Sequence, residues 1–272
     1  MLDWFPGTAK KASLWGAFFV CAVGVLLPLP VQAAADCRAP AGLRAAQVEA
    51  VEDGDTLRLT DGRSVRLIGL NAPEKARGER PAEPLAEAAT RHLQQLVDAS
   101  GGRVGLLAGA QVRDRYGRSL AHAFGRDGRN WEAQLLAEGL GFAVAIAPNT
   151  ALLDCQFAAE RRARAARRGI WRRSALLAAG QLRRSGFALV RGRVAAVERN
   201  RGGVWLELDG ALVLRVEPQW LGDFDERTLR GLAGRVVEAR GWVVERGRRG
   251  ALKPGQARWL LNLNHPAMLE VR

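Results

Sequence analysis

Apolar and polar residues alternate in two short runs near the start of the chain, on either side of an Asp-Gly pair. Polar residues separate Leu57 from Leu59, and Val65 and Leu67 repeat the pattern after Asp61-Gly62. Alternation with a period of two is typical of a β-strand with one buried face, and Asp-Gly favours the positive φ of a tight turn. The pattern therefore predicts a β-hairpin here.

Residues 75–172 switch between helical and strand patterns. Leu85, Ala89, Leu93 and Leu96 form one helical stripe, and Asn130 is a residue type that caps helices. The predicted elements are a loop at 75–84, a helix at 85–97, strands at 104–106 and 120–124 around a turn at 114–118, a helix from 130 to 139 and a third helix from 148–150 to 168. This order predicts a small mixed barrel with helices packed outside.

A second set of strand patterns begins at Phe187. The predicted elements are strands at 189–197, 204–208 and 212–216, a short helix at 221–232, and strands at 236–245 and 259–263. Three strands, a helix and two strands is the order of an OB-like barrel. The chain is thus predicted to be mainly β with α (α+β), with a first domain at 36–172, a linker at 173–186 and an accessory barrel at 187–272.

Residues 1–35 have the composition of a signal peptide. Lys10 and Lys11 precede a short apolar run, and small residues around Ala33 would suit cleavage. The alternative is an uncleaved anchor, but Pro28 and Pro30 interrupt the run, which falls short of the roughly 20 residues of a span. We expect an exported protein, periplasmic or secreted, with no membrane span after cleavage.

Cleavage would leave two cysteines, Cys37 and Cys155, in an oxidising compartment. We expect them to form a disulfide, because free thiol pairs are less common outside the cytosol. The alternative is two buried free thiols.

The composition adds a strong positive charge. The 272 residues carry a formal net charge of +13, and arginine supplies most of it. Basic character spread over a whole chain is weaker support for a nucleic-acid partner than a local patch would be. The sequence contains no Gly-rich nucleotide motif, Walker loop, nucleophile elbow or CxxC pair, so no nucleotide cofactor is expected.

Five short motifs, in order, resemble the thermonuclease (staphylococcal nuclease-like) family. They are GDT at 54–56, RLIGLNAPE at 66–74, DRYGR at 114–118, EGL at 138–140 and GIW at 169–171. The resemblance covers roughly residues 46–172. It implies a five-stranded OB-fold barrel with three helices, and calcium-dependent hydrolysis of phosphodiester bonds in DNA or RNA. The accessory barrel contains no motif by which we recognise a family.

The resemblance also assigns roles to individual residues. It implies Asp55, Asn71 and the carbonyl oxygen of Ala72 as calcium ligands, Glu74 as the base, Arg66 and Arg118 as the clamp on the reacting phosphate, and Arg115 and Tyr116 as phosphate contacts. Taken singly, each has a simpler interpretation. The acidic residues suit turns, and exposed arginines are common in this chain.

Two departures from the family pattern favour an alternative function. Asn71 stands where the family has an aspartate, and Val144 and Ile146 stand where it has nucleotide-contacting tyrosines. A ligand set with one charge less should bind calcium more weakly. The alternative is a non-catalytic protein that binds nucleic acid or an envelope partner through tandem OB-like domains.

Other polar and aromatic residues have mainly structural interpretations. His92 and His122 lack neighbours at ligand spacing, and we expect at least two of Trp205, Trp242 and Trp259 to be core residues. The opposite hypothesis is a stacking platform with phosphate partners at Arg191, Arg193, Arg215 and Arg240. The loop at 246–253 is the best candidate nucleic-acid contact outside the first domain.

Overall fold

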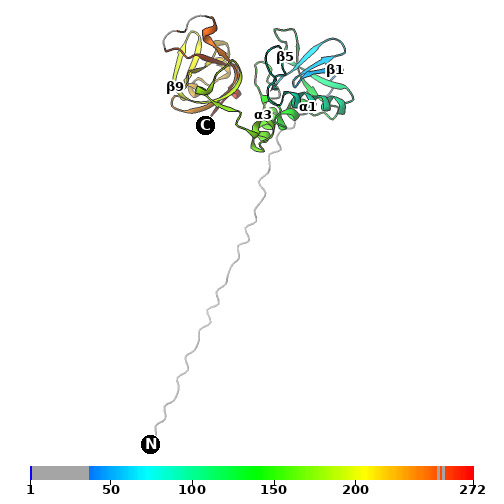
Figure 1. Cartoon of the computed structure of the whole chain (residues 1–272), viewed down its shortest axis with the longest axis horizontal. Coiled ribbons are helices and arrows are strands. Elements are labelled where there is room, and N and C mark those ends of the chain that lie inside the picture. The colour runs from blue at the N-terminus through cyan, green and yellow to red at the C-terminus, as the bar shows by residue number, and fades with distance from the viewer. Residues whose placement is uncertain (2–36, 250–251, 253–254) are drawn as a thin grey trace. The chain divides into compact units, whose positions relative to one another are not determined.

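The computed structural model describes residue 1 and residues 37–249, 252 and 255–272 (Figure 1). The expected signal peptide therefore lies outside the described residues, as does part of the 246–253 loop. All the elements below belong to one compact unit. No helix of the described residues is long and apolar enough to cross a membrane.

The first domain is a closed barrel of five strands. They are β1 (Ala45–Asp53), β2 (Thr56–Leu59), β3 (Ser64–Leu67), β5 (Arg103–Arg113) and β6 (Ser119–Phe124). The order around the barrel is β1-β2-β3-β6-β5, and β3 and β6 run parallel. The predicted hairpin is β2 and β3, whose alternating residues Leu57, Leu59, Val65 and Leu67 point into the core. The OB-fold prediction is confirmed.

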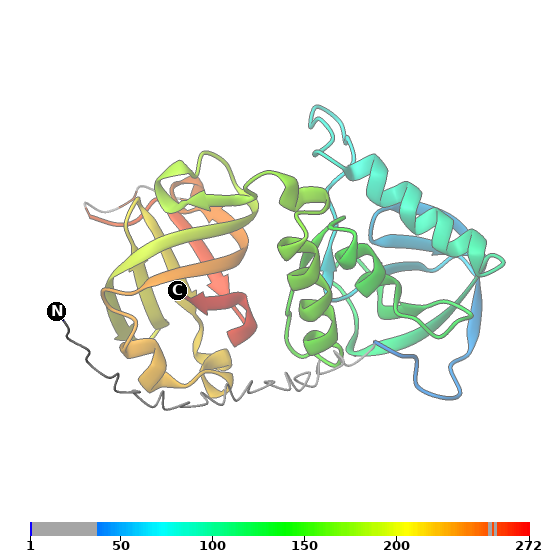
Figure 2. The same ribbon diagram turned by 90° about the horizontal axis from the view of Figure 1, so that it is seen from below.

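Three α-helices accompany this barrel, and Figure 2 shows the long α1 lying along it. They are α1 (Ala86–Ala99), α2 (Trp131–Ala137) and α3 (Leu153–Ala165). As predicted, the Asn130 side chain caps α2 by accepting a hydrogen bond from the Ala133 N–H. The third helix begins later than expected, because Asn149 is used in a turn: its Oδ1 accepts the Gln111 N–H at 2.8 Å.

A separate two-stranded ribbon links the hairpin to the helices. Its strands are β4 (Leu70–Asn71) and β7 (Phe142–Ala143). The Glu160 side chain of α3 accepts the Ala143 N–H at 2.8 Å, so this helix fixes the position of the ribbon. Close packing also requires Gly141, since a Cβ there would approach the Asn71 carbonyl oxygen to 2.9 Å. The position of β4 therefore depends on contacts distant in sequence.

A disulfide joins Cys37 to Cys155, as expected, with the two Cα atoms 5.5 Å apart. It ties the segment before β1 to α3 across a sequence separation of 118 residues. A loop of this size constrains the unfolded chain strongly.

We expect reduction of this disulfide to lower the free energy of unfolding by about 4.7 kcal/mol, from the loss of loop-closure entropy. Urea unfolding of the oxidised and reduced protein measures the difference. A Cys37→Ser/Cys155→Ser double variant is the control, and reductant should leave its midpoint unchanged. Equal midpoints for oxidised and reduced wild type would contradict the prediction.

The accessory domain is a second barrel. Its strands are β8 (Leu176–Ala178), β9 (Gly186–Asn200), β10 (Gly203–Leu208), β11 (Leu212–Val216), β12 (Val236–Glu245), β13 (Trp259–Leu263) and β14 (Leu269–Val271). In the sheet order β14-β12-β13-β11-β10-β9-β8, an additional β12–β9 pairing closes a ring of five strands. The parallel pairing of β11 with β13 completes the OB-like order that the sequence predicted.

Two local predictions in the accessory domain differ from the structure. The stretch expected as a linker contains β8, which pairs in parallel with β9. The expected helix at 221–232 is split into a 3-10 turn, η3 (Pro218–Asp223), and a short helix, α4 (Glu226–Arg230). The split falls at Phe224, whose extended backbone buries its ring, after which Asp225 caps α4.

Ion pairs connect α3 to β12 within this unit. Arg240 of β12 binds Glu160 with an Nη1–Oε2 distance of 2.6 Å, and their side chains are only 8% and 3% exposed. Arg240 also donates to the Ala143 carbonyl oxygen at 3.0 Å. In a second ion pair α3 supplies the arginine and β12 the acid: Arg164 binds Glu238 at 3.0 Å. Arg240 is therefore an internal ion-pair residue, and the hypothesis that it contacts phosphate is wrong.

The three tryptophans also differ from the expectation. Trp259 is buried, Trp205 is half-buried, and Trp242 is 42% exposed. Only one of the three is a core residue, so the expectation of two was wrong. Trp242 and Trp205 instead lie on the outer face of the sheet, where Trp205 carries the guanidinium of Arg215 over its ring.

Glu238 should make stability depend on pH in acid. Burial alone would raise the pKa of Glu238, but hydrogen bonds from Arg272, Arg164 and Arg191 outweigh burial and lower it to about 2. As the pH falls, Glu238 therefore takes up its proton at a lower pH in the folded state than in the unfolded state, where its pKa lies near 4.5. The stabilisation is present above about pH 4.5 and is lost as the pH falls toward 2.

The expected loss is on the order of 1–2 kcal/mol once solvent screening is considered. Thermal unfolding at a series of pH values measures it, and Glu238→Gln should flatten that part of the curve. A variant curve parallel to wild type would rule out Glu238 as the titrating group.

Candidate active site

The turn before β2 places one carboxylate inside the protein. Asp53 Oδ1 accepts the Asp55 N–H at 3.0 Å, which closes the turn and accounts for Asp53 structurally. The Asp55 side chain is directed inward and is only 2% exposed. Its Oδ2 accepts the Ala72 N–H at 2.8 Å, and Thr56 donates its hydroxyl to Oδ1 at 3.2 Å. The carboxylate is thus held in one orientation between β2 and β4.

Arg66 of β3 connects this carboxylate to Asn71. One Nη of Arg66 forms an ion pair with Asp55 Oδ1, and the other donates to Asn71 Oδ1 at 3.4 Å and to the Leu70 carbonyl oxygen at 3.3 Å. Both Asp55 and Asn71 are buried. The hairpin and β4 therefore bring together four predicted site residues, Asp55, Arg66, Asn71 and Ala72, by direct contacts.

Further charges act on Arg66. Burial lowers the pKa of Arg66 to about 10, and the positive charge of Arg118 acts in the same direction. The carboxylates of Asp53, Glu74 and Asp114 oppose this effect and raise the pKa. At neutral pH the guanidinium remains charged. Glu74 and Arg118 thus lie within the electrostatic surroundings of Arg66, although neither is hydrogen-bonded to it.

Arg118 is fixed by the turn between β5 and β6. Gly117 has φ +83°, which allows the tight turn, and the Asp114 carboxylate accepts both the Arg118 N–H at 3.0 Å and its Nε–H at 2.7 Å. Burial alone would raise the pKa of Asp114, but the hydrogen bonds from Arg118 and from the Tyr116 N–H lower it. Asp114 was not among the predicted site residues, although its spacing of four from Arg118 within one motif points to this contact.

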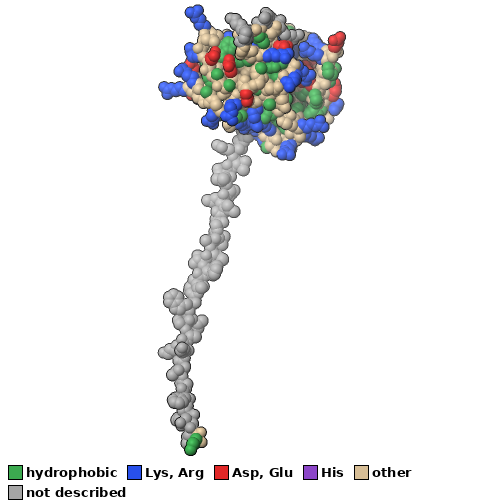
Figure 3. Space-filling view, turned by 60° about the vertical axis from the view of Figure 1, so that its left-hand side comes forward, with side chains coloured by type: hydrophobic (Ala, Val, Ile, Leu, Met, Phe, Trp, Pro, Cys, Tyr) green, Lys and Arg blue, Asp and Glu red, His purple; other side chains and the backbone are tan. Residues whose placement is uncertain are grey.

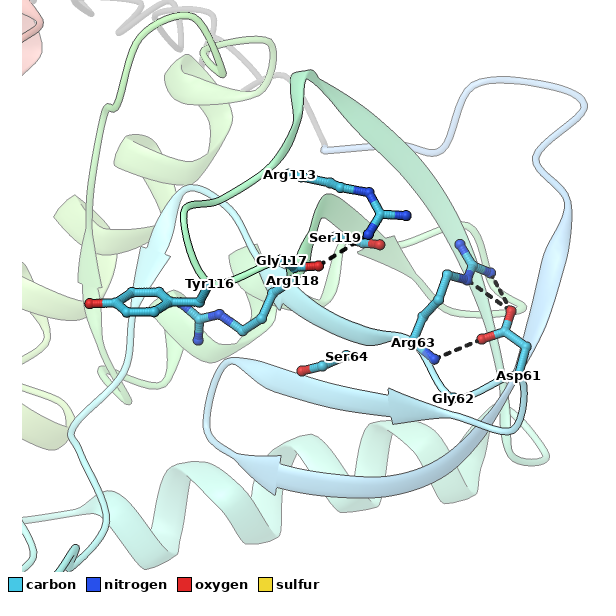
Figure 4. A pocket seen from close by; sticks show the side chains of 9 residues that line it. All are labelled: Asp61, Gly62, Arg63, Ser64, Arg113, Tyr116, Gly117, Arg118 and Ser119. Carbon is cyan, nitrogen blue, oxygen red and sulfur yellow. Dashed lines mark hydrogen bonds and ion pairs between the residues drawn. The ribbon is translucent and has the colours of Figure 1, made fainter.

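Arg115 and Tyr116 lie at the tip of the same turn. Arg115 donates to the Tyr116 hydroxyl at 2.7 Å, and its guanidinium carbon lies 4.8 Å from the centre of the ring. Tyr116 is 70% exposed, and Figure 4 shows its ring extending away from the turn beside Arg118. The pair is therefore accessible to a ligand.

Glu74 follows β4 on an exposed segment. Its backbone N–H donates to the Glu83 carboxylate at 3.1 Å, and the Glu83 N–H donates to the Glu74 carbonyl oxygen at 2.8 Å. These two bonds close the loop between β4 and α1 and leave the Glu74 side chain exposed at its start. The loop thus provides an accessible carboxylate next to Ala72.

Val144 and Ile146, at the positions where the family pattern has tyrosines, differ in their exposure to solvent. Val144 is buried in the core, whereas Ile146 is 39% exposed. His122, expected to be structural, is buried and lies 3.2 Å from the Glu132 carboxylate, which also accepts the Ala123 N–H. His122 is thus a residue of β6 whose side chain lies in the interior.

The oxygen atoms of Asp55, Asn71 and Ala72 suit a hard divalent cation. Calcium prefers carboxylate, amide and carbonyl oxygens, and this set contains no nitrogen or sulfur donor. The described residues contain no group of three or more His, Cys, Asp or Glu side chains that could hold a metal ion. Asp55 Oδ1 and Asn71 Oδ1 both engage Arg66, so that a cation would compete with the guanidinium.

The barrel and this cluster define an OB-fold protein with a cationic, oxygen-rich site between its hairpin and the β5–β6 turn. The staphylococcal nuclease homologue family model matches residues 64–173. A thermonuclease of Staphylococcus intermedius is 32% identical over 129 residues, which are 46% of this chain and 75% of that protein. The chain therefore belongs to the staphylococcal nuclease homologue family.

A second relative is an uncharacterized protein of Bacillus anthracis. It is 30% identical over 125 residues, which are 44% of this chain and 58% of that protein. The family model ends near the end of η1 (Gly169–Arg172), and the accessory barrel lies beyond the matched region.

Proposed function

We propose that the protein is an exported, calcium-dependent nuclease that hydrolyses phosphodiester bonds of DNA or RNA. The observation that carries this proposal is the cluster of Asp55, Arg66 and Asn71, joined by direct contacts, with Arg118 and Glu74 close enough to affect the pKa of Arg66. Family membership supports a nuclease. The N-terminal sequence pattern and the disulfide support export.

Each proposed role follows from the position of the group. Asp55, Asn71 and the Ala72 carbonyl would hold calcium, which when bound neutralises phosphate charge and makes a coordinated water more acidic. Glu74, exposed beside Ala72, would accept a proton from the attacking water. The planar guanidinium groups of Arg66 and Arg118 suit the bidentate recognition of a phosphate.

Arg66 connects calcium binding with substrate binding. In this structure its guanidinium uses oxygen atoms of both Asp55 and Asn71. A cation at these oxygen atoms would compete with the guanidinium, and a displaced guanidinium would be available to a phosphate. Calcium and substrate are therefore expected to bind with positive cooperativity.

A nuclease assay with a calcium titration tests the proposal. Purified mature protein should degrade single-stranded DNA or RNA when calcium is present, and chelation with EDTA should stop the reaction. Glu74→Gln should lower kcat by about 10²–10⁴, the range of general base catalysis. Intact substrate after long incubation with millimolar calcium would refute the nuclease assignment.

Asn71→Asp should strengthen calcium binding, because it adds a negative charge to the proposed ligand set. We expect the calcium concentration at half-maximal binding to fall about tenfold, equivalent to about 1.4 kcal/mol. Calorimetric titration of calcium into both proteins measures this directly. Asn149→Asp, at a buried asparagine between β7 and α3, is the control, and an unchanged affinity for Asn71→Asp would exclude position 71 as a ligand.

The second candidate is a nucleic-acid-binding protein without catalysis. It is favoured by one observation, the occupation of Asp55 and Asn71 oxygens by Arg66. Salt-sensitive binding of DNA without cleavage at any calcium concentration would support this candidate, because phosphate-driven affinity falls steeply with salt.

A further inference from the structure

A basic pocket lies beside the candidate active site, between the β2–β3 turn and the β5–β6 turn. Its volume is about 390 Å³. The nine lining residues, drawn in Figure 4, are Asp61, Gly62, Arg63, Ser64, Arg113, Tyr116, Gly117, Arg118 and Ser119. Three arginines and one aspartate give the lining a positive charge, and two serines add hydroxyl groups. The pocket is therefore suited to an anion.

The arginines of the pocket differ in their partners. Arg63 is held by Asp61, with its Nε–H donating to the carboxylate at 2.8 Å, but its side chain is 47% exposed. Arg113 donates to the Gly117 carbonyl oxygen at 3.3 Å, a neutral partner, and forms no ion pair with any acid among the described residues. Exposed guanidinium groups at the ends of two different strands can turn toward a common ligand.

A nearby carboxylate, Glu52, does not cancel the positive charge of the pocket. Ser64 donates its hydroxyl to Glu52 at 3.4 Å, and Glu52 is also paired with Arg58. This pair keeps the acid neutralised outside the pocket. Figure 3 shows other basic side chains spread over the visible face of the protein, so that charge alone does not distinguish this pocket. Its distinguishing feature is its connection to the site.

Two strands connect the pocket to the site. Ser64 begins β3 and Ser119 begins β6, and the parallel register places Val65 opposite Ser119 and Arg66 opposite Leu120. Arg118 lines the pocket and directly precedes β6, the strand that pairs with β3 beside Arg66. A polyanion with one phosphate between Arg66 and Arg118 would thus have its neighbouring phosphate at the mouth of the pocket.

We propose that this pocket binds a second phosphodiester of the nucleic-acid strand, adjacent to the reacting phosphate, through Arg63 and Arg113. The inference rests on the proposed nuclease function for the identity of the strand. It extends the substrate contact beyond Arg115 and Tyr116 and assigns the pocket to backbone recognition. Backbone contacts of this type raise affinity without selecting a base sequence.

Binding without cleavage provides the test. A labelled single-stranded oligonucleotide of about 12 nucleotides, within the 4–16 nucleotide range of an OB fold, is titrated in EDTA and followed by fluorescence anisotropy. We expect Arg63→Gln and Arg113→Gln each to weaken binding about threefold to tenfold. Each should also reduce the magnitude of the salt slope by up to about 0.7, the value for one phosphate of a single strand, because both arginines contact the same phosphate.

The chain offers a matched control. Asp127-Gly128-Arg129 repeats the Asp61-Gly62-Arg63 sequence, and in both turns the arginine N–H donates to the aspartate Oδ1 at 3.0 Å. Arg129→Gln removes an equivalent turn arginine outside the pocket and should leave the salt slope unchanged. Asp61→Asn should strengthen binding, because it releases Arg63. If Arg129→Gln weakens binding as much as Arg63→Gln, or if neither pocket variant changes the slope, the inference is overturned.

Kinetics separate this inference from the proposed function. In active protein, Arg113→Gln should raise KM for the oligonucleotide with kcat unchanged, and should have no effect on a substrate with a single phosphodiester. If wild type does not cleave but the pocket variants still change the salt slope, the nuclease proposal fails and the second phosphate site stands. If cleavage is normal and the slope is unchanged, the pocket assignment fails alone.

Discussion

Arg118→Ala is expected to lower kcat for calcium-stimulated cleavage by about 10²–10³, the cost of removing one preorganised group that stabilises charge in a transition state. The Asp114 carboxylate holds both the backbone and the side chain of Arg118, so that the guanidinium is already oriented before substrate arrives. Steady-state kinetics on a single-stranded oligonucleotide at saturating calcium measures the effect. Arg118→Lys should recover only part of the rate, because lysine keeps the charge but cannot bind bidentately.

The control for this prediction is Arg129→Ala, which removes an exposed arginine of the same domain. It should leave kcat within about twofold of wild type, since surface ion pairs contribute little. Thermal unfolding of Arg118→Ala checks that the variant is folded. A change in KM alone would show that Arg118 binds ground state and transition state equally, which would contradict its role in the reaction.

Arg240→Met is expected to lower the free energy of unfolding by about 3–5 kcal/mol, the cost of leaving one member of a buried ion pair without its partner. Glu160 would keep its contact with the Ala143 N–H but lose the cation that neutralises it. The Ala143 carbonyl oxygen would lose a donor as well. Urea unfolding, monitored by circular dichroism, measures the change.

A neighbouring arginine provides the comparison. Arg191 binds Glu238, but its side chain is 48% exposed and two other arginines share the same carboxylate. Arg191→Met should therefore cost less than about 1 kcal/mol. In Arg240→Met/Glu160→Gln, a neutral amide still accepts from Ala143, and we expect the double variant to recover part of the stability. A loss for Arg240→Met as small as that for Arg191→Met would show that the pair is not a major contributor.

Elements determined by local pattern could be predicted from the sequence. The hairpin follows from strict alternation around Asp61-Gly62, and the start of α2 follows from the capping side chain of Asn130. The ribbon of β4 and β7 has no such pattern, because each strand has two residues and β7 is held by the Glu160 side chain of α3. Leu176–Ala178 likewise forms a strand because it pairs in parallel with β9, whereas its sequence predicts part of a linker.

The sequence predicted those residues of the candidate site that lie within a recognisable motif. Asp55, Arg66 and Asn71 lie within a single stretch of the sequence, and the fold brings them into direct contact. The roles themselves remain proposals. Arg63 and Arg113 gave no signal, because arginine is abundant throughout the chain and the two lie fifty residues apart. The pairing of β6 with both β3 and β5 brings them to one pocket.

The contact between Arg240 and Glu160 has a consequence for the order in which the protein is made. A growing polypeptide contains every proposed ligand and catalytic residue by the time residue 172 has been synthesised. The carboxylate that holds β7 against β4 receives its cation only when residue 240 has followed. A chain truncated between these two points would carry the complete site sequence on an incompletely supported ribbon. We therefore expect the site to reach its final geometry only after residue 240 has been added to the chain.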